Sequence, residues 1–149
     1  HFAIVGIGED ADYLDAVARE ANVEDRVHRL GHVPMEDLPR WYNACDLFVL
    51  ANREIGGDTE GFGIVVLEAA ACGKAAIAGR AGGTGSAVLD GVTGVRIDAG
   101  SEVELVATLE RLLGDPRLLE TMGQAGLARV RESLSWQAVA ELTQDSLRA

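Results

Sequence analysis

The chain has 149 residues, of which 48% are hydrophobic, and its 13 Lys and Arg against 24 Asp and Glu give a formal net charge of −11. This length and composition are typical of a soluble globular domain with a sizeable core, and they argue against a disordered segment. No apolar run approaches the roughly 20 residues that a transmembrane helix needs. The acidic excess argues against nucleic acid as the main partner, because nucleic-acid affinity comes from Lys and Arg contacts to phosphate.

Strand-like and helix-like patterns alternate along the first two thirds of the chain. In chain order they predict a buried strand over 2–5, a helix over 13–21, a strand over 26–30, a helix over 38–44, a strand over 46–50, a glycine-rich loop over 52–61, a helix over 62–72, and strands over 74–78 and 94–97. Helices over 103–113, 116–131 and 135–147 follow, the second with Pro116 in its first turn and the third capped by Ser135.

The alternation of strands with helices of about 10–12 residues predicts parallel strands joined by right-handed crossovers. The expected fold class is α/β, with a doubly wound, Rossmann-like parallel sheet followed by C-terminal helices. We find no repeat and no internal domain boundary. Such sheets bind ligands beyond the carboxyl ends of their strands, so the loops after residues 5, 30, 50 and 78 are the candidate ligand-binding loops.

Residues 6–11 (GIGEDA) match the dinucleotide fingerprint G-x-G-x-x-A. The strand that follows ends in Leu30-Gly31-His32, without the acidic residue that would hold a ribose hydroxyl. Glu9 and Asp10 would also place negative charge beside a pyrophosphate. We therefore expect a tight strand-to-helix turn here rather than a NAD site.

Neither the cysteines nor the histidines predict a metal site. Cys45 and Cys72 are the only cysteines and lack C-x-x-C spacing, so free thiols are expected. His28 and His32 are four residues apart, but they flank the end of a predicted strand, where the helical spacing of metal ligands does not apply.

The strongest candidate site is the segment over residues 58–69 (DTEGFGIVVLEA). A glycine-bounded loop enters a helix here, so the amides of residues 61–64 are expected to point at a ligand anion. Glu60 and Glu68 are separated along the helical rise by about one sugar ring or more. An ionised carboxylate can accept hydrogen bonds from two vicinal hydroxyls. Diols at both ends of a phosphate describe a nucleotide sugar.

A purely structural interpretation of the same residues makes Glu68 a solvated helix residue and Glu60 an N-terminal helix charge. The neighbours of Glu68 are apolar on nearly all sides, which predicts a buried face where a carboxylate needs a partner. The pattern therefore favours a functional role for Glu68.

The glycine-rich residues 79–86 (GRAGGTGS) form a second candidate loop, able to wrap a phosphate or a sugar. The alternative is a flexible loop without a ligand. The loop over 79–86 is expected to lie at the same sheet edge as Glu60, and this position favours contact with a ligand.

Together these segments resemble the C-terminal half of a retaining glycosyltransferase of the GT-B fold, in the large family 4 (glycosyl transferases group 1). Glu60 and Glu68, with seven residues between them, match the family's E-x7-E signature. The other family motifs occur in the family's order, at residues 5–8 (VGIG), 30–33 (LGHV), 44–47 (ACDL), 71–74 (ACGK), 82–83 (GG), 91–94 (GVTG) and 134–136 (LSW). The long loop over 53–59 resembles the phosphatidylinositol mannosyltransferase branch.

The resemblance implies an enzyme that moves a hexose, of mannose or glucose type, from a nucleotide diphosphate sugar to an acceptor hydroxyl with retention at the anomeric carbon. The donor would be GDP- or UDP-linked, with GDP-mannose suggested by the loop over 53–59. Amide dipoles would stabilise the leaving phosphate, so no metal or other cofactor is implied. The implied site residues are Glu60 as the catalytic residue; Gly61, Phe62, Gly63, Ile64, Gly82, Gly83 and Thr84 for the donor sugar and phosphate; Glu68 for the ribose; and Gly31, His32 and Val33 for the base.

The sequence departs from the family pattern at several positions. Ser86 stands where the family usually has Glu, which would weaken a contact near the donor, and Ala75 stands where Pro is usual. The resemblance implies that residues 1–149 are one nucleotide-sugar-binding domain without the family's first strand-helix unit and without the N-terminal acceptor domain. Only Arg53 and Arg80 lie near the site loops in sequence, so we expect the 149 residues alone to be inactive.

The partners implied are a nucleotide-sugar donor and an acceptor lipid or glycan bound through the missing domain, with no nucleic acid. The implied location is cytoplasmic, with peripheral association of the full-length enzyme at the inner face of the membrane. Two other functions stay open: a non-catalytic nucleotide-sugar binding module and a GT-B-type epimerase.

Overall fold

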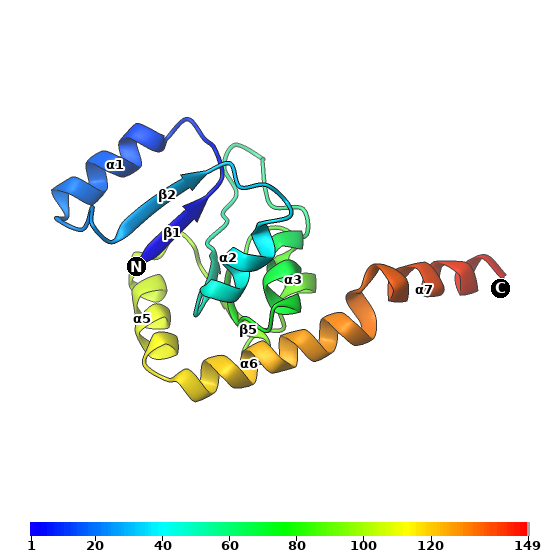
Figure 1. Cartoon of the computed structure of the whole chain (residues 1–149). Coiled ribbons are helices and arrows are strands. Elements are labelled where there is room, and N and C mark those ends of the chain that lie inside the picture. The colour runs from blue at the N-terminus through cyan, green and yellow to red at the C-terminus, as the bar shows by residue number, and fades with distance from the viewer. Residues whose placement is uncertain (149) are drawn as a thin grey trace. The chain divides into compact units, whose positions relative to one another are not determined.

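Strands and helices alternate in the order that the sequence predicts (Figure 1). The structure is a computed structural model that describes residues 1–148. Its elements are β1 (Phe2–Val5), α1 (Ala11–Glu20), β2 (Val27–Gly31), α2 (Leu38–Ala44), β3 (Phe48–Leu50), α3 (Ile64–Ala71), β4 (Ala76–Gly79), α4 (Thr84–Ala87), β5 (Gly94–Ile97), α5 (Glu102–Leu113), α6 (Pro116–Arg129), the π-helical turn η1 (Val130–Leu134) and α7 (Trp136–Arg148).

The chain divides into two compact units, His1–Leu38 and Pro39–Ala149, where the sequence indicates no internal boundary. All strand pairs are parallel, as predicted, but they form two sheets, β1-β2 and β3-β4-β5, rather than one. The division follows from the pairing: within residues 1–148, β1 hydrogen-bonds to β2 alone and β3 to β4 alone.

In the first unit, the prediction of a buried first strand is wrong in its burial. β1 forms at the predicted residues and pairs with β2 from Phe2↔Val27 onward, but Phe2 is 53% exposed and Val5 is 44% exposed. This unit has two strands and one main helix, α1, whose only buried residue is Ala18. A layer that small cannot cover both faces of a strand.

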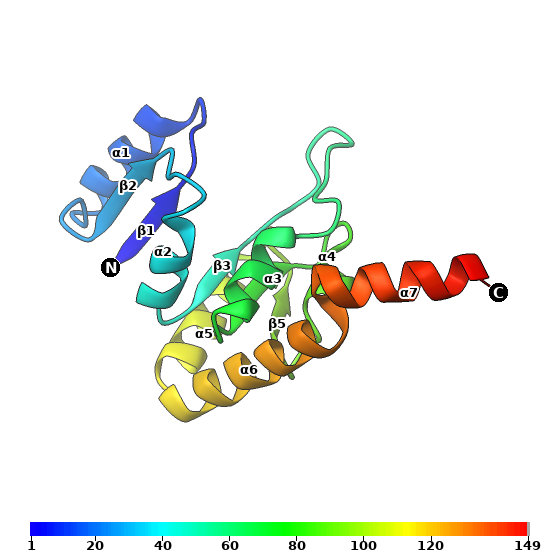
Figure 2. The same ribbon diagram turned by 45° about the vertical axis from the view of Figure 1, so that its right-hand side comes forward.

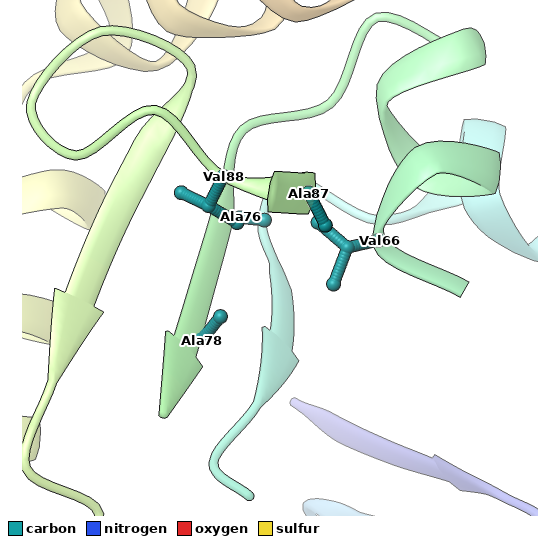
Figure 3. Close-up of a cluster of buried hydrophobic side chains, with 5 residues drawn as sticks. All are labelled: Val66, Ala76, Ala78, Ala87 and Val88. Atoms are coloured by element: carbon teal, nitrogen blue, oxygen red, sulfur yellow. The ribbon is translucent and has the colours of Figure 1, made fainter. Parts of the chain in front are cut away.

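In the second unit, side chains of β4 alternate between two apolar clusters on opposite faces of the sheet. Val66 of α3 and Ala87 of α4 point toward one another over Ala76, Ala78 and Val88 in one cluster (Figure 3). The other cluster joins β4 and β5 to α5 and α6, and its buried members are Ala75, Ile77, Ile97, Leu112 and Met122. The three-stranded sheet is thus covered on both faces, which fixes its carboxyl edge as the place where loops can meet a ligand.

The C-terminal helices begin where the sequence predicts. Ser101 and Asp115 cap α5 and α6 by accepting hydrogen bonds from Glu104 N and Leu118 N at 3.2 and 3.0 Å. Ser135 accepts one from Ala138 N at 3.2 Å. The predicted second helix differs in ending as the π-helical turn η1, after which α7 extends away from the three-stranded sheet (Figure 2). None of the helices within residues 1–148 combines the length and apolar character needed to cross a membrane.

Candidate functional site

The loops that follow β3 and β4 are in direct backbone contact, as their predicted place on one sheet edge requires. Gly83 N donates a 2.9 Å hydrogen bond to Glu60 O. A Cβ on Gly83 would lie 1.9 Å from Gly61 O, and one on Gly82 would lie 2.1 Å from Glu60 O. Glycine at 82 and 83 is therefore required for the loops to touch. This contact brings together the residues predicted for the donor sugar and phosphate.

The Glu60 carboxylate caps the entrance to α3. Its Oε1 accepts hydrogen bonds from Gly63 N at 2.9 Å and from Phe62 N at 3.3 Å. Gly63 has φ +82°, a left-handed conformation that favours glycine and turns the chain into the helix. Two of the four amides expected to face a ligand, those of Phe62 and Gly63, thus donate to the protein's own carboxylate, and these two are free for a ligand anion only when Glu60 turns away.

Glu68 has a partner, as the apolar character of its helix predicts. Tyr42 of α2 donates a hydrogen bond from its hydroxyl to Glu68 Oε2 at 2.7 Å, and both side chains are half-buried. Burial first, and then the hydrogen bond to the carboxylate, raise the pKa of Tyr42 well above its ordinary value near 10. Tyr42 thus stays a neutral donor and leaves Glu68 Oε1 without a protein partner among the described residues.

The loop after β4 is held at two carbonyls by side chains of the site. Asn52, which follows β3, donates from Nδ2 to Ala81 O at 2.8 Å and accepts at Oδ1 from Gly79 N at 3.0 Å. Thr84 is fully buried and donates from Oγ1 to Gly79 O at 2.6 Å. The loop is therefore fixed to its neighbours rather than flexible.

The prediction of an irregular loop throughout residues 79–86 is wrong at its end, where residues 84–87 form the short helix α4. Arg129 at the end of α6 donates to both terminal carbonyls of α4, with Nη1 to Ala87 O at 2.8 Å and Nη2 to Ser86 O at 2.6 Å. A cation at the carboxyl end of a helix satisfies groups that the helix itself cannot. This long-range contact gives α4 a stability that its own sequence does not predict.

Two cavities adjoin these loops. One, of about 470 Å³, lies along the loop after β3 and includes Glu60, Thr59 and Arg53 in its lining. The other, of about 350 Å³, lies where the chain leaves β3, β4 and β5, and Arg53 and Arg80 both line it. Arg53 borders both cavities and makes no hydrogen bond or ion pair within the described chain.

Arg80 is engaged by the half-buried carboxylate of Glu104. Its guanidinium donates to both Glu104 oxygens, at 2.6 and 3.1 Å. These hydrogen bonds, followed by one from Asp98 N, hold the pKa of Glu104 below its usual range. Of the two basic residues expected near the site, Arg53 is thus the one whose charge is available to a ligand.

The predicted base-binding residues lie in the first unit. Gly31 ends β2 with φ +64° and accepts a 2.8 Å hydrogen bond at its carbonyl from Gly6 N. His32 is exposed and Val33 is half-buried. Between β1 and α1 the chain makes a short turn that includes Gly6, so the fingerprint residues form the expected strand-to-helix connection.

Asp10 and Asp12 have D-x-D spacing and lie at the start of α1. Within residues 1–148, no group of three or more His, Cys, Asp or Glu side chains could hold a metal ion. Cys45 and Cys72 are free thiols, as expected. Burial raises the pKa of each thiol, and the nearby Lys74 opposes that rise.

Three residues of the site were missed by sequence reasoning: Tyr42, Asn52 and Arg129. Each hydrogen-bonds to a residue 26 to 43 positions away in the chain: Tyr42 to Glu68, Asn52 to Gly79 and Arg129 to Ser86. A signal existed only for Tyr42, because a buried Glu68 demands a donor.

Residues 1–129 match the family described as glycosyl transferases group 1. The chain is 39% identical over 138 residues to a GDP-mannose-dependent alpha-(1-6)-phosphatidylinositol monomannoside mannosyltransferase of Mycolicibacterium smegmatis, covering 91% of this chain and 36% of the relative. It is 32% identical over 136 residues to a D-inositol 3-phosphate glycosyltransferase of Pseudarthrobacter chlorophenolicus, covering 91% of this chain and 31% of that relative. The chain thus spans about a third of the length of these curated relatives.

Two solved structures have a fold similar to that of this chain. Anabaena HepE in complex with UDP superposes with a TM-score of 0.84 at 26% identity, covering 98% of this chain and 40% of that one. The C-terminal domain of a glycosyl transferase group 1 family protein from Francisella tularensis gives a TM-score of 0.76 at 27% identity, covering 88% and 67%.

The family match, the curated relatives and the parallel α/β fold place this domain in the glycosyltransferase class, with the Rossmann-like arrangement that the sequence predicts. The chain belongs to the glycosyl transferases group 1 family.

Proposed function

We propose that this chain is the donor-binding part of a retaining hexosyltransferase and holds a nucleotide diphosphate hexose at the carboxyl edge of β3 and β4. The observation that carries the proposal is the contact between the Glu60 and Gly83 loops, with Glu68 one helix turn or more away. Two carboxylates flanking a group of backbone amides offer acceptors for hydroxyls on both sides of a pyrophosphate.

In this role Glu68 accepts hydrogen bonds from the ribose diol through Oε1, while Tyr42 holds Oε2. Glu60 turns from the amides of Phe62 and Gly63 to the hexose hydroxyls. The amides then face the negative charge that develops on the leaving phosphate, and preorganised donors of this kind stabilise a transition state without reorganisation. Metal-independent transfer is part of the proposal.

GDP-mannose is the favoured donor. It is supported by the named donor of the Mycolicibacterium smegmatis relative, at 39% identity, while the complex of HepE with UDP keeps a UDP-linked hexose as the alternative. The base-binding role expected of Gly31, His32 and Val33, in the first unit, stays a prediction.

The acceptor is proposed to be a lipid or glycan hydroxyl, bound by parts of the protein outside these residues. The two relatives named above carry phosphatidylinositol mannoside and inositol phosphate in their names, which supports an inositol-containing acceptor. Such a lipid acceptor would bring the whole enzyme to the cytoplasmic face of the membrane as a peripheral protein. The 149 residues alone are proposed to bind donor without transferring sugar.

Isothermal titration calorimetry with GDP, UDP, ADP, GDP-mannose and UDP-glucose tests the donor site. We expect measurable binding of one nucleotide and of its sugar conjugate. Glu68→Ala should weaken both by about tenfold, the size expected for losing hydrogen bonds to a charged group. Glu110→Ala, which removes an exposed carboxylate from α5, is the matched control and should bind like the parent chain. Absence of binding by every nucleotide would overturn the assignment.

A further inference from the structure

Three consecutive carbonyls are tethered by side chains where the chain leaves β4. Gly79 O accepts from Thr84 Oγ1 at 2.6 Å, and Ala81 O accepts from Asn52 Nδ2 at 2.8 Å. Arg80 O, between them, accepts from Arg96 Nη2 at 3.0 Å. Thr84 and Asn52 belong to the loops of the candidate site, whereas Arg96 lies on β5, the edge strand of the sheet.

Arg96 reaches the loop along one face of the sheet. Its backbone is fixed by the register Ala78↔Arg96 and by a 2.8 Å hydrogen bond from Arg96 N to Asp90 Oδ1. Its guanidinium lies against Gly85 of α4, where a Cβ would be 3.1 Å from Nη1 and 3.3 Å from Cζ. A methyl group at position 85 would therefore press on the guanidinium, which would have to shift to make room.

The hydrogen bonds of Arg96 are poorly suited to a role in stability alone. Its Nε is buried and is the one such side-chain atom within residues 1–148 that has no hydrogen-bond partner. A buried donor without a partner opposes folding, because it loses its hydration and gains nothing in return. The same guanidinium donates from Nη2 to Arg80 O and leaves Nε without a partner.

We propose that Arg96, with Gly85 beneath it, is a positioning residue that sets the Gly82–Thr84 loop and thereby the affinity for the hexose part of the donor. The inference rests on the proposed function. The Gly82–Thr84 loop contacts the Glu60 segment through the 2.9 Å hydrogen bond from Gly83 N to Glu60 O. Glu68 lies on α3 and is held from α2 by Tyr42. A displaced loop therefore weakens hexose contacts and leaves nucleotide contacts in place.

The test compares the affinity for a nucleotide sugar with that for its free nucleotide, by calorimetry with GDP-mannose and GDP, and with UDP-glucose and UDP. Arg96→Leu removes the tether and should weaken sugar-nucleotide binding about tenfold, the loss expected for one hydrogen bond from a charged group. Binding of the free nucleotide should change by less than about twofold on the same scale. Arg117→Leu, at an exposed position on α6, is the matched control and should change neither.

Two further variants separate positioning from folding. Arg96→Lys keeps one charged donor and should recover part of the affinity. Gly85→Ala should weaken sugar-nucleotide binding when Arg96 is present, since its methyl group displaces the guanidinium, and should add nothing in the Gly85→Ala/Arg96→Leu double variant. Thermal unfolding of each variant identifies any that does not fold.

Equal losses for nucleotide and nucleotide sugar, or an Arg96→Leu chain that binds like the parent, would overturn the inference and leave the proposed function standing. If Arg96→Leu fails to fold, additive effects of Gly85→Ala and Arg96→Lys overturn it instead. A parent chain that binds no nucleotide sugar overturns the proposed function itself, and the inference with it.

Discussion

Tyr42 donates its hydroxyl proton to Glu68 Oε2 at 2.7 Å, which joins α2 to α3 beneath one end of the candidate site. The tyrosine fixes the rotamer of the carboxylate and occupies one of its oxygens. The remaining oxygen is then presented in a single direction, as preorganised recognition of a diol requires.

Tyr42→Phe should lower nucleotide affinity by about three- to tenfold, because the Glu68 side chain stays in place but loses the hydrogen bond that orients it, worth about 1 kcal/mol. Calorimetry with the nucleotide that the parent chain binds measures the effect. Tyr13→Phe is the control, since Tyr13 is the only other tyrosine and is 66% exposed on α1. Unchanged affinity in Tyr42→Phe would show that Glu68 does not depend on its partner.

The hydrogen bond between Tyr42 and Glu68 also predicts that the folded chain loses stability at alkaline pH. Folding raises the pKa of Tyr42 above its unfolded value near 10, so the neutral phenol is favoured in the folded chain. Its contribution to stability is fully present below about pH 10 and is lost as the pH rises toward the folded-state pKa. Following tyrosinate absorbance during an alkaline titration should reveal one tyrosine that ionises late. That late phase should vanish in Tyr42→Phe, and its persistence there would contradict the assignment.

Asn52→Ala should destabilise the second unit by about 1–3 kcal/mol, because Gly79 N and Ala81 O each lose a half-buried partner. Chemical denaturation measures the free energy of unfolding. Asn43→Ala provides the comparison: Asn43 is exposed and its side chain makes one hydrogen bond, to Pro39 O, so the loss of this side chain should cost no more than about 0.5 kcal/mol. A similar cost for the two variants would argue against a special role for Asn52.

Gly83→Ala should cost about 1–3 kcal/mol, because its Cβ would lie 1.9 Å from Gly61 O and the two site loops would have to separate. Gly61→Ala supplies the matched change, since nothing lies within 4 Å of a Cβ at that position. Thermal unfolding should therefore distinguish two alanines only 22 residues apart in sequence but in contact in space. Indistinguishable midpoints would mean that the loops adjust freely.

Local patterns were sufficient to predict most of the fold. The strand over 94–97 and the helix over 38–44 form at the predicted residues, because apolar periodicity and flanking turn residues are properties of short segments. The separation into two sheets was not predictable in the same way. Periodicity shows that a strand exists and not which strand it pairs with.

The candidate site, too, was predictable only where its residues lie close together in sequence. Glu60, Glu68 and the paired glycines could be selected from the sequence because they lie within one loop and one helix, or within one glycine-rich loop. The capping of Phe62 and Gly63 amides by Glu60 could not, since a carboxylate two or three residues away can point either to solvent or back to the chain. Arg96 and Arg129 were equally hidden, because each serves carbonyls on a distant segment.

One guanidinium at the end of α6 has a mechanical consequence. Arg129, the last residue of that helix, holds Ser86 O and Ala87 O; the π-helical turn begins immediately after it and leads into α7. The C-terminal helices are therefore not a passive cover for the sheet. Any sliding or rotation of α6 must either carry α4 with it or break both hydrogen bonds at once, so α4 and the C-terminal helices act as coupled parts.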